Sequence, residues 1–445
     1  LKRIWCQQKR GEGEGQMKLI LYSWNANNEQ ILMDNLIKPG FEVVCFRKEC
    51  RHYTRDMELA MEMIPFIHAQ GAEAVVSFNY FPIVSMICNT CQIPYYAWVY
   101  DCPHFTLYAK QIGLPCNHIG IFDREMVGQL EGYGVNTVHH VPLAVDADHF
   151  EAVISQATPQ EKERFRWDIS FVGSLYTDEH NYYDRLFGEE DAVKQEDMSE
   201  RAVECSSRQG ERPAAGLAAI ASGISRQCFA YHGDYLRQAV MDGNIDLGRI
   251  QVQMEKQGLM LGEDYYAKAE DILLAAVLEK KVTVEERRIL LTQMAGRFAI
   301  SANNDGAGNR GSNFRLYTGS DTSALPKLDF CNCGTVDYHT QMPLVFAGSR
   351  INLNISLRSI HSGIPLRVLD IMACGGFVLS NWQPEIAEYF EEGVEIVTFD
   401  SLDDCLAKTA YYLSHEEERR QIAANGKRKV QEKFSYQVGL ERLFG

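Results

Sequence analysis

The sequence predicts an α/β protein built from two Rossmann-like parallel-sheet domains that face each other across a cleft. Short apolar segments alternate with helical patterns from Lys18 onwards, which is typical of βαβ units and parallel sheets. The alternation occurs in two series, the second of which begins at Asp168. With 445 residues, 46% of them apolar, the chain is long enough for two or three packed domains at ~100–200 residues each.

The first series contains several strand candidates, and we assign it to an N-terminal domain at residues 17–145. The candidates lie at 19–22, 42–46, 74–78, 95–99, 118–122 and 137–141. Helical patterns separate several of them, for example at 55–69 and 124–131. Residues 1–16 precede the first methionine and carry no apolar periodicity, so we expect a non-native or disordered leader there.

The second series predicts a C-terminal domain at residues 168–435. Its strand candidates lie at 168–172, 314–317, 351–355, 377–379 and 395–399, with helical patterns at 366–373 and 402–413. Residues 181–298 favour helix and contain no convincing parallel strand, which indicates a helical insertion. Within it, residues 189–223 are rich in Gly, Glu, Ser and Ala, so we expect a mobile surface segment.

Two further segments join and close these domains. Residues 142–158 carry turn residues and little apolar periodicity, as a connection between domains would, and we assign the connection to 146–167. Near the end of the chain, residues 415–433 predict a long charged helix, and residues 436–445 a short C-terminal helix.

Composition excludes several classes of function. The chain has 44 Lys and Arg against 60 Asp and Glu, a net charge of −16, which argues against a nucleic acid partner. No apolar run of ~18 residues and no secretory signal is present, so we expect a cytoplasmic protein without a transmembrane segment. Thirteen scattered cysteines favour reduced thiols, and the isolated pair Cys88 and Cys91 favours ordinary core cysteines over a metal site.

Polar residues follow the strand candidates repeatedly. In the first series they are Ser23, Asn25, Asn79, Asp101, His104 and Asp123. In the second series they are Gly173, Ser174, Thr318, Gly319, Ser320, Ser356, Arg358, Ser380 and Asn381. Because ligands of open parallel sheets bind outside the carboxyl ends of the strands, we expect these residues to line a cleft between the domains.

The segment at 351–381 is the densest in such residues. It predicts a strand, a polar loop with Arg358 and His361, a helix that starts at Pro365, and a Gly-Gly end to that helix. Arg367 and Asp370 are spaced i, i+3 and therefore share a helix face. They form either an exposed ion pair or a site in which the guanidinium binds a diphosphate at the helix N-terminus and the carboxylate binds ribose hydroxyls.

This segment, LRVLDIMACGGFVLSN, resembles the donor-binding segment of GT-B glycosyltransferases, most closely the bacterial CgeB-like (spore maturation protein) glycosyltransferases. WVYDCPH at 98–104 and IFDRE at 121–125 resemble the uncharacterised domain that often precedes it. DISFVGSLY at 168–176 is similar to the family's entry into the second domain, and VPLAVDADHF at 141–150 to its interdomain crossing. The resemblance extends from Met17 to the C-terminus.

The resemblance implies a metal-independent transferase that moves a sugar from a nucleotide-sugar donor, bound mainly by the second domain, to an acceptor bound by the first. The acceptor is unidentified and could be a glycan, a protein or a small molecule, and no cofactor besides the donor is expected. The expected donor-binding residues are Gly173, Ser174, Gly319, Ser320, Arg358, His361, Arg367 and Asp370. The expected acceptor-binding residues are Asn25, Asn79 and Asp123, and the expected catalytic residues are the base His104 and its orienting carboxylate Asp101.

Several alternatives remain open at this point. Many retaining GT-B enzymes carry two glutamates eight positions apart, where this chain has Ser362 and Asp370. The stereochemistry is therefore open, and a catalytically inactive nucleotide-binding or partner-binding protein is the alternative. Asp101 could instead cap a helix. Asp146 and Asp148 have the spacing of a metal-binding pair but lie in the domain connection. The glycine pattern at 306–311 matches a dinucleotide fingerprint, but no strand precedes it and no helix follows it.

Overall fold

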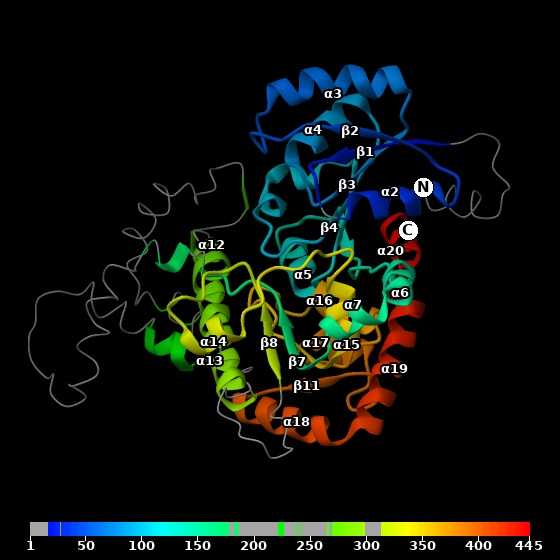
Figure 1. Ribbon diagram of the computed structural model, residues 1–445. Helices are drawn as coiled ribbons and strands as arrows, with labels where there is room; N and C mark the ends of the chain where they lie inside the picture. Colours follow the sequence, from blue (N-terminus) through cyan, green and yellow to red (C-terminus); the bar gives the residue numbers. More distant parts are fainter. Residues whose placement is uncertain are drawn as a thin grey trace, which may run out of the picture.

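The computed structural model describes residues 17–26, 28–177, 182–184, 186, 221–226, 238, 242, 265–266, 269–298 and 313–445. The expected leader at 1–16, the glycine-rich loop at 306–311 and nearly all of the segment at 189–223 lie outside the described residues. Two lobes stack on each other, with the N-terminal lobe in blue and cyan and the C-terminal lobe in green to red (Figure 1). Each lobe contains one parallel sheet, which confirms the predicted fold class.

The N-terminal lobe contains a six-stranded parallel sheet in the order β2-β1-β3-β4-β5-β6. The strands are β1 (Lys18–Ser23), β2 (Glu42–Arg47), β3 (Ala74–Phe78), β4 (Tyr95–Val99), β5 (Asn117–Ile121) and β6 (Val138–His140). The helices between them are α2 (Glu29–Ile37), α3 (Met57–Gln70), α4 (Pro82–Cys91), the 3₁₀-helices η1 (Phe105–Tyr108) and η2 (Lys110–Gly113), and α5 (Arg124–Gly132). The chain passes from β1 to β2 on one side of β1, and β3 lies on the other side. The strand order therefore reverses between β1 and β3, and their carboxyl ends form the crevice where such sheets bind ligands.

The C-terminal lobe contains a five-stranded parallel sheet in the order β11-β10-β9-β7-β8. The strands are β7 (Trp167–Val172), β8 (Phe314–Tyr317), β9 (Ser349–Asn354), β10 (Val378–Asn381) and β11 (Val397–Phe399). The helices around them are α14 (Pro326–Cys331), α15 (Met342–Gly348), α16 (Leu366–Ala373), α17 (Pro384–Tyr389), α18 (Leu402–Ser414) and α19 (Glu416–Lys433). Here the corresponding crevice lies between the carboxyl ends of β7 and β9.

Between β7 and β8, residues 269–298 form one long helical segment. It consists of α12 (Ala269–Ile272), the π-helix η3 (Leu273–Leu278) and α13 (Glu279–Phe298). Leu290, Leu291 and Met294 of α13 are fully buried against the C-terminal sheet. This helix therefore belongs to the core of the C-terminal lobe, although it lies in the region expected to be an insertion.

The connection between the lobes differs from the expectation of turns alone. It contains α6 (Ala147–Gln156) and α7 (Pro159–Arg164). The Asp146 side chain accepts from the His149 N–H and so caps α6, and Phe150 is buried against the C-terminal lobe. The helix forms because Asp146 caps it and because the apolar side chains of Ala147, Phe150, Val153 and Ile154, at helical spacing, contact the C-terminal core.

The end of the chain crosses back to the N-terminal lobe. The C-terminal helix α20 (Tyr436–Leu443) lies beside α2, and Leu440 and Leu443 are buried against the first sheet. A Cβ atom at Gly439 would lie 2.0 Å from the Trp98 ring, so only glycine allows this close approach. The chain therefore passes between the lobes twice, at Val145 and at Phe434. The two crossings are bonded to each other, because the Val145 N–H donates to the Phe434 carbonyl over 2.9 Å.

Candidate functional site

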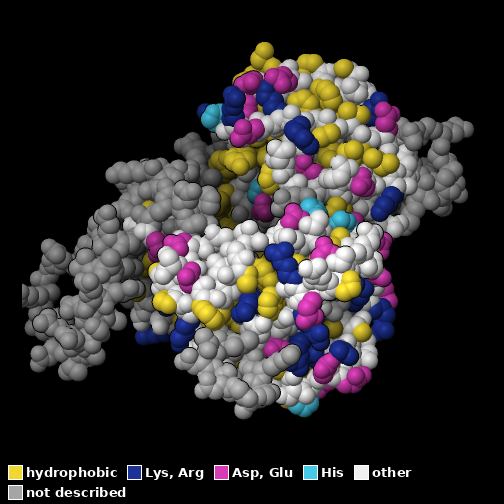
Figure 2. Space-filling model, in the orientation of Figure 1, with side chains coloured by type: hydrophobic (Ala, Val, Ile, Leu, Met, Phe, Trp, Pro, Cys, Tyr) yellow, Lys and Arg dark blue, Asp and Glu magenta, His cyan; other side chains and the backbone are white. Residues whose placement is uncertain are grey.

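A cavity of about 960 Å³ lies between the two lobes. Figure 2 shows this hollow between the upper and the lower lobe. Its walls are the segments that follow β1, β3 and β4 in the N-terminal lobe, the start of α16 in the C-terminal lobe, and the first turn of α13. The chemically informative lining residues are Trp24, Asn25, Asn28, Asn79, Asp101, His104, Tyr176, Lys280 and Arg367. A concave site at the carboxyl ends of parallel strands, between two lobes, is where such folds bind their ligands.

Asn79 organises the N-terminal wall. Its side-chain oxygen accepts from the backbone N–H groups of Tyr100 (2.9 Å) and Asp101 (3.2 Å), and its amide donates to Asp101 Oδ2 over 2.6 Å. Asn79 adopts a left-handed conformation with φ of 58°, and Asn25 at the end of β1 does the same with φ of 70°. Such backbone conformations are uncommon outside glycine and concentrate at functional sites. Asn79 therefore holds the exposed Asp101 carboxylate in place at the cavity wall.

His104 lies on the same wall. Its Nε2 atom is 3.2 Å from the Tyr80 carbonyl oxygen and 3.3 Å from the Tyr80 amide nitrogen. Burial lowers the pKa of His104, although the nearby charge of Asp101 acts in the opposite direction. The imidazole is therefore neutral at pH 7, which is the form that can accept a proton.

Arg367 forms the charged part of the opposite wall. It is the second residue of α16, whose N-cap Pro365 provides no side-chain capping bond, so the backbone N–H groups of Leu366 and Arg367 remain available to an anion. Arg367 Nη1 lies 3.2 Å from Asp370 Oδ2. Asp370 is only 1% exposed, does not line the cavity, and accepts from the Tyr338 hydroxyl over 2.9 Å. Burial raises the pKa of Asp370 to about 6, although Arg367 lowers it.

Arg358 and His361 do not line the cavity, because acidic residues of α13 bind them. Arg358 Nε lies 2.9 and 3.0 Å from the two carboxylate oxygens of Glu286. His361 Nε2 lies 3.0 Å from Glu279 Oε1. Burial lowers the pKa of His361, but Glu279 outweighs this effect and raises it to about 9. Both cations are thus already neutralised by carboxylates.

The four small residues expected at the donor site line a separate depression of about 440 Å³ beside the carboxyl ends of β7 and β8. They are Gly173, Ser174, Gly319 and Ser320. Ser320 Oγ lies 3.2 Å from Ser174 Oγ and accepts from the Leu175 N–H over 2.9 Å. These two loops are therefore bonded to each other at the edge of the C-terminal lobe.

Asp123 is 1% exposed and joins the lobes instead of facing the cavity. It caps α5 and also accepts from the backbone N–H of His361 over 2.6 Å and from Ser362 Oγ over 2.9 Å. Ser362 Oγ is 2.8 Å from Glu385 Oε1, and Glu385 Oε2 is 2.8 Å from His140 Nε2. We call Asp123, His140, Ser362 and Glu385 the interlobe latch.

Lys280 and Tyr176 line the cavity but were not among the expected site residues. Lys280 lies in the region expected to be a helical insertion and does not follow a strand candidate of the sequence, so the rule that located the other residues could not find it. Tyr176 is the last residue of the DISFVGSLY segment at 168–176 and has φ of 57°, which no local pattern indicates. Trp24 also lines the cavity, and its indole N–H donates to the Phe78 carbonyl over 2.9 Å.

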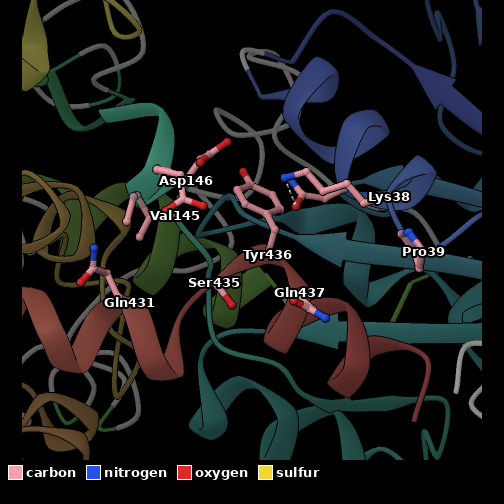
Figure 3. Close-up of a pocket in the computed structure, with 11 residues that line it drawn as sticks. Lys38, Pro39, Val145, Asp146, Gln431, Ser435, Tyr436 and Gln437 are labelled. Atoms are coloured by element: carbon pink, nitrogen blue, oxygen red, sulfur yellow. Dashed lines mark hydrogen bonds between the residues drawn. The ribbon is translucent and has the colours of Figure 1, made fainter. Parts of the chain in front are cut away.

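The Asp146 and Asp148 pair lines a different pocket, of about 310 Å³, at the junction of the domain connection, α2 and α20 (Figure 3). Asp146 caps α6, as described above, and Asp148 is exposed. Lys38, also at this pocket, donates to the side chain of Asn35 over 3.2 Å. Within the described ranges, no three His, Cys, Asp or Glu side chains converge as a metal site.

Comparison with known proteins gives a consistent result. A family model described as "Glycosyl transferase-like" matches residues 299–445, and no curated protein sequence matches the chain. The structure of Anabaena HepE in complex with UDP-glucose is similar, with a TM-score of 0.50 and 8% identity over 96% of this chain and 98% of that one. Sucrose-phosphate synthase from Thermosynechococcus elongatus has a TM-score of 0.50 and 9% identity over 96% and 97%. A glycosyltransferase from Rickettsia africae has a TM-score of 0.49 and 10% identity over 97% of both chains.

Of the helices in the described parts of the chain, none is both long enough and apolar enough to cross a membrane. The likeness to the HepE and sucrose-phosphate synthase structures covers 96% of this chain and therefore both sheets. This chain therefore has the GT-B fold, and its residues 299–445 match the family model described as glycosyl transferase-like.

Proposed function

We propose that this protein is a metal-independent glycosyltransferase that moves a sugar from a nucleotide-sugar donor to an acceptor hydroxyl, and that it is a member of the CgeB-like group. The observation that carries the proposal is the interlobe cavity, in which Arg367 and the N-terminus of α16 face Asp101 and His104. A group that binds an anion and a group that can accept a proton thus share one space, as sugar transfer requires.

The C-terminal wall would bind the donor. A helix N-terminus favours an anion through its free N–H groups and its dipole, and the Arg367 guanidinium can bind two phosphate oxygens at once. The depression beside β7 and β8, with Ser174 and Ser320, would hold the nucleoside. Asp370 would act through Arg367, because it is buried below that side chain. Since a structurally similar protein is known in complex with UDP-glucose, UDP-glucose is the first donor to test.

The N-terminal wall would bind and activate the acceptor. His104 would take the proton of the acceptor hydroxyl while the acceptor oxygen forms its bond to the anomeric carbon and the bond to the diphosphate breaks. The Asp101 carboxylate would stabilise the imidazolium that results, and Asn79 would keep Asp101 in position. Asn25 would contribute a further polar contact to the acceptor.

A catalytically inactive nucleotide-binding protein is the second candidate. The observation in its favour is Ser362, which stands at the position of the first glutamate of many retaining enzymes and whose hydroxyl belongs to the interlobe latch. That hydroxyl is buried and cannot reach a sugar in this arrangement.

Donor hydrolysis separates the two candidates. The protein is incubated with UDP-glucose and a panel of other nucleotide-sugars, and released nucleoside diphosphate is measured together with binding by thermal shift. A transferase releases nucleotide slowly even without its acceptor, and Arg367→Ala should abolish the release. A binding protein raises its melting temperature with the donor but releases no nucleotide.

A further inference from the structure

Trp24 follows β1 at the cavity wall, and two hydrogen bonds fix it there. Its indole N–H donates to the Phe78 carbonyl over 2.9 Å, and its backbone N–H donates to Glu29 Oε1 over 2.8 Å. Glu29 is only 7% exposed and also accepts from the Ala26 N–H over 3.0 Å, so one buried carboxylate sets the shape of this loop. The ring is therefore held in position before any ligand binds.

The Trp24 ring belongs partly to the core and partly to the cavity wall. It packs against the hydrophobic cluster of the N-terminal lobe, with its centre 6.2 Å from that of the Phe81 ring. Its remaining surface lines the cavity. The indole N–H is the only donor of this side chain, and it is already bonded to Phe78. The ring therefore offers a ligand an apolar, electron-rich surface and no hydrogen bond.

Polar side chains continue the same wall beside this surface. Strands β1, β3 and β4 are neighbours in the sheet, so the residues that follow them form a row along the cavity. The row consists of Trp24, Asn25, Asn79 and Asp101. Because neighbouring strands lie ~4.8 Å apart, the row is about 10 Å long. Asn25 and Asp101 are exposed. The wall thus combines one aromatic surface with amide and carboxylate groups at its side.

We propose that the acceptor is a neutral saccharide and that one of its rings stacks on Trp24. This inference rests on the proposed function, which makes the N-terminal wall the acceptor site. A sugar ring carries C–H groups on its faces and hydroxyls around its edge. The C–H groups have a partial positive charge that the negative face of an indole attracts, and stacking also removes apolar surface from water. The edge hydroxyls would then lie along the row towards Asp101 and His104.

The charges of the two walls favour a neutral saccharide over other ligands that contact aromatic rings. Asp101 is the one Asp or Glu among the described lining residues, and it disfavours an anionic acceptor beside it. An acyl chain would leave the carboxylate and the amides of this wall without partners. The donor nucleoside is assigned to the depression beside β7 and β8, which lies in the other lobe.

Transfer assays test the proposal, with UDP-glucose or the nucleotide-sugar that the protein hydrolyses fastest as the donor. The neutral acceptors are methyl glucoside, methyl galactoside, maltose, cellobiose and lactose. Glucuronic acid, a sugar phosphate, a serine-rich peptide and a long-chain alcohol represent the other classes. Products are identified by mass spectrometry, and donor hydrolysis without an acceptor is measured in parallel. We expect transfer to a neutral saccharide to be faster than transfer to any other class.

Substitutions of Trp24 separate stacking from a structural role. Trp24→Ala should raise the KM for the saccharide about tenfold, which corresponds to ~1.4 kcal/mol, and leave donor hydrolysis unchanged. Trp24→Phe should retain most of the affinity, because it keeps an aromatic face although it loses the bond to Phe78. Tyr411→Ala is the matched control, since Tyr411 is an aromatic residue of α18 that is 45% exposed and does not line the cavity. It should change neither quantity, with folding of all variants checked by circular dichroism.

Three outcomes would overturn the inference and leave the proposed function in place. The first is a protein that hydrolyses the donor but transfers to none of the neutral saccharides. The second is an equal rise in KM in Trp24→Phe and Trp24→Ala, which assigns the effect to the lost indole bond. The third is weaker UDP and uridine binding in Trp24→Ala with an unchanged saccharide KM, which places Trp24 at the nucleobase.

Failure of the proposed function gives a different result. If the wild-type protein hydrolyses no nucleotide-sugar but binds a neutral saccharide in calorimetric titration, and Trp24→Ala loses this binding, the saccharide site is supported and the transferase is not. If it neither hydrolyses a donor nor binds a saccharide, both are wrong.

Discussion

Replacing Ser362 by glutamate would restore the acid that the resemblance leads one to expect, but the structure predicts that it will separate the lobes instead of improving catalysis. Ser362 Oγ lies 2.9 Å from Asp123 Oδ1 and 2.8 Å from Glu385 Oε1. The three side chains are 4%, 1% and 2% exposed, respectively. A glutamate at this position would bring a third carboxylate into a space that excludes water and already holds two.

The expected magnitudes differ between substitutions. Ser362→Ala removes a hydroxyl that bonds to charged groups, but Asp123 and Glu385 keep backbone donors, for example the His361 N–H and the Arg124 N–H. We expect a loss of ~1–3 kcal/mol in the free energy of unfolding. Ser362→Glu adds a buried charge without a partner. We expect it to lower the free energy of unfolding by ~3–5 kcal/mol or to separate the lobes.

Urea unfolding and small-angle X-ray scattering measure these effects. Ser359→Ala is the matched control, because Ser359 is 3% exposed in the same loop and its hydroxyl has no hydrogen-bond partner among the described residues. It should cost little or stabilise the protein, since it removes an unsatisfied buried group. A Ser362→Glu protein as stable, as compact and at least as active as the wild type would refute the reasoning and place Ser362 at the donor.

Three further predictions follow from the site. Arg367→Ala should weaken UDP binding ~10- to 100-fold without unfolding the protein. Arg367→Lys should recover only part of the loss, because lysine lacks the planar guanidinium that binds two oxygens at once, and calorimetric titration with UDP measures both affinities. Donor binding and turnover should survive chelation, because Arg367 and the α16 N-terminus are assigned the diphosphate charge; loss of activity in EDTA that manganese or magnesium restores would contradict the assignment. Asp370→Asn should remove a pH dependence of stability. Burial raises the pKa of Asp370 from 3.8 to about 6, so the folded protein holds a proton that the unfolded chain has lost between these values. The contribution of this group to stability therefore falls by ~3 kcal/mol as the pH rises from about 4 to about 6. Denaturant titrations should give the wild type and the variant similar free energies of unfolding at pH 4, and a higher value for the variant at pH 7.

The strands and the donor-side helix could be predicted from the sequence, because parallel strands buried on both faces form continuous apolar segments. β3 and β4 are buried at every position and lie at the predicted bounds, 74–78 and 95–99. α16 begins at Leu366 and ends at Ala373, and Gly375 just beyond it adopts a left-handed conformation (φ of 71°), as the Pro and Gly-Gly signals indicated. Helix α6 was not predicted, although its apolar side chains at 147, 150, 153 and 154 have helical spacing, because the turn residues around it indicated a connection.

The candidate site could be predicted only in part, because a strand end locates a residue but does not show what its side chain binds. Asn79, Asp101 and Arg367 line the cavity, as their positions after strands or at a helix start suggested. Asp123 also follows a strand, but its carboxylate is used to join the lobes.

Arg358 and Lys280 show why the charge of a binding site depends on tertiary pairing. By its position, Arg358 should be the better phosphate ligand, since it follows β9 at the expected edge of the sheet. Its partner Glu286 comes from a helix 72 positions earlier in the chain, and no pattern within either segment indicates that they meet. Because a buried carboxylate needs a cation nearby, Glu286 would lose much of its stabilisation if Arg358 turned towards a ligand. The helix that occupies Arg358 also carries Lys280, one turn before the residue that accepts from the Arg358 N–H, so a single helix contacts the loop after β9 and lines the cavity. A substitution in α13 should therefore disturb the loop after β9 as directly as one in the loop itself, although the two segments are far apart in the sequence.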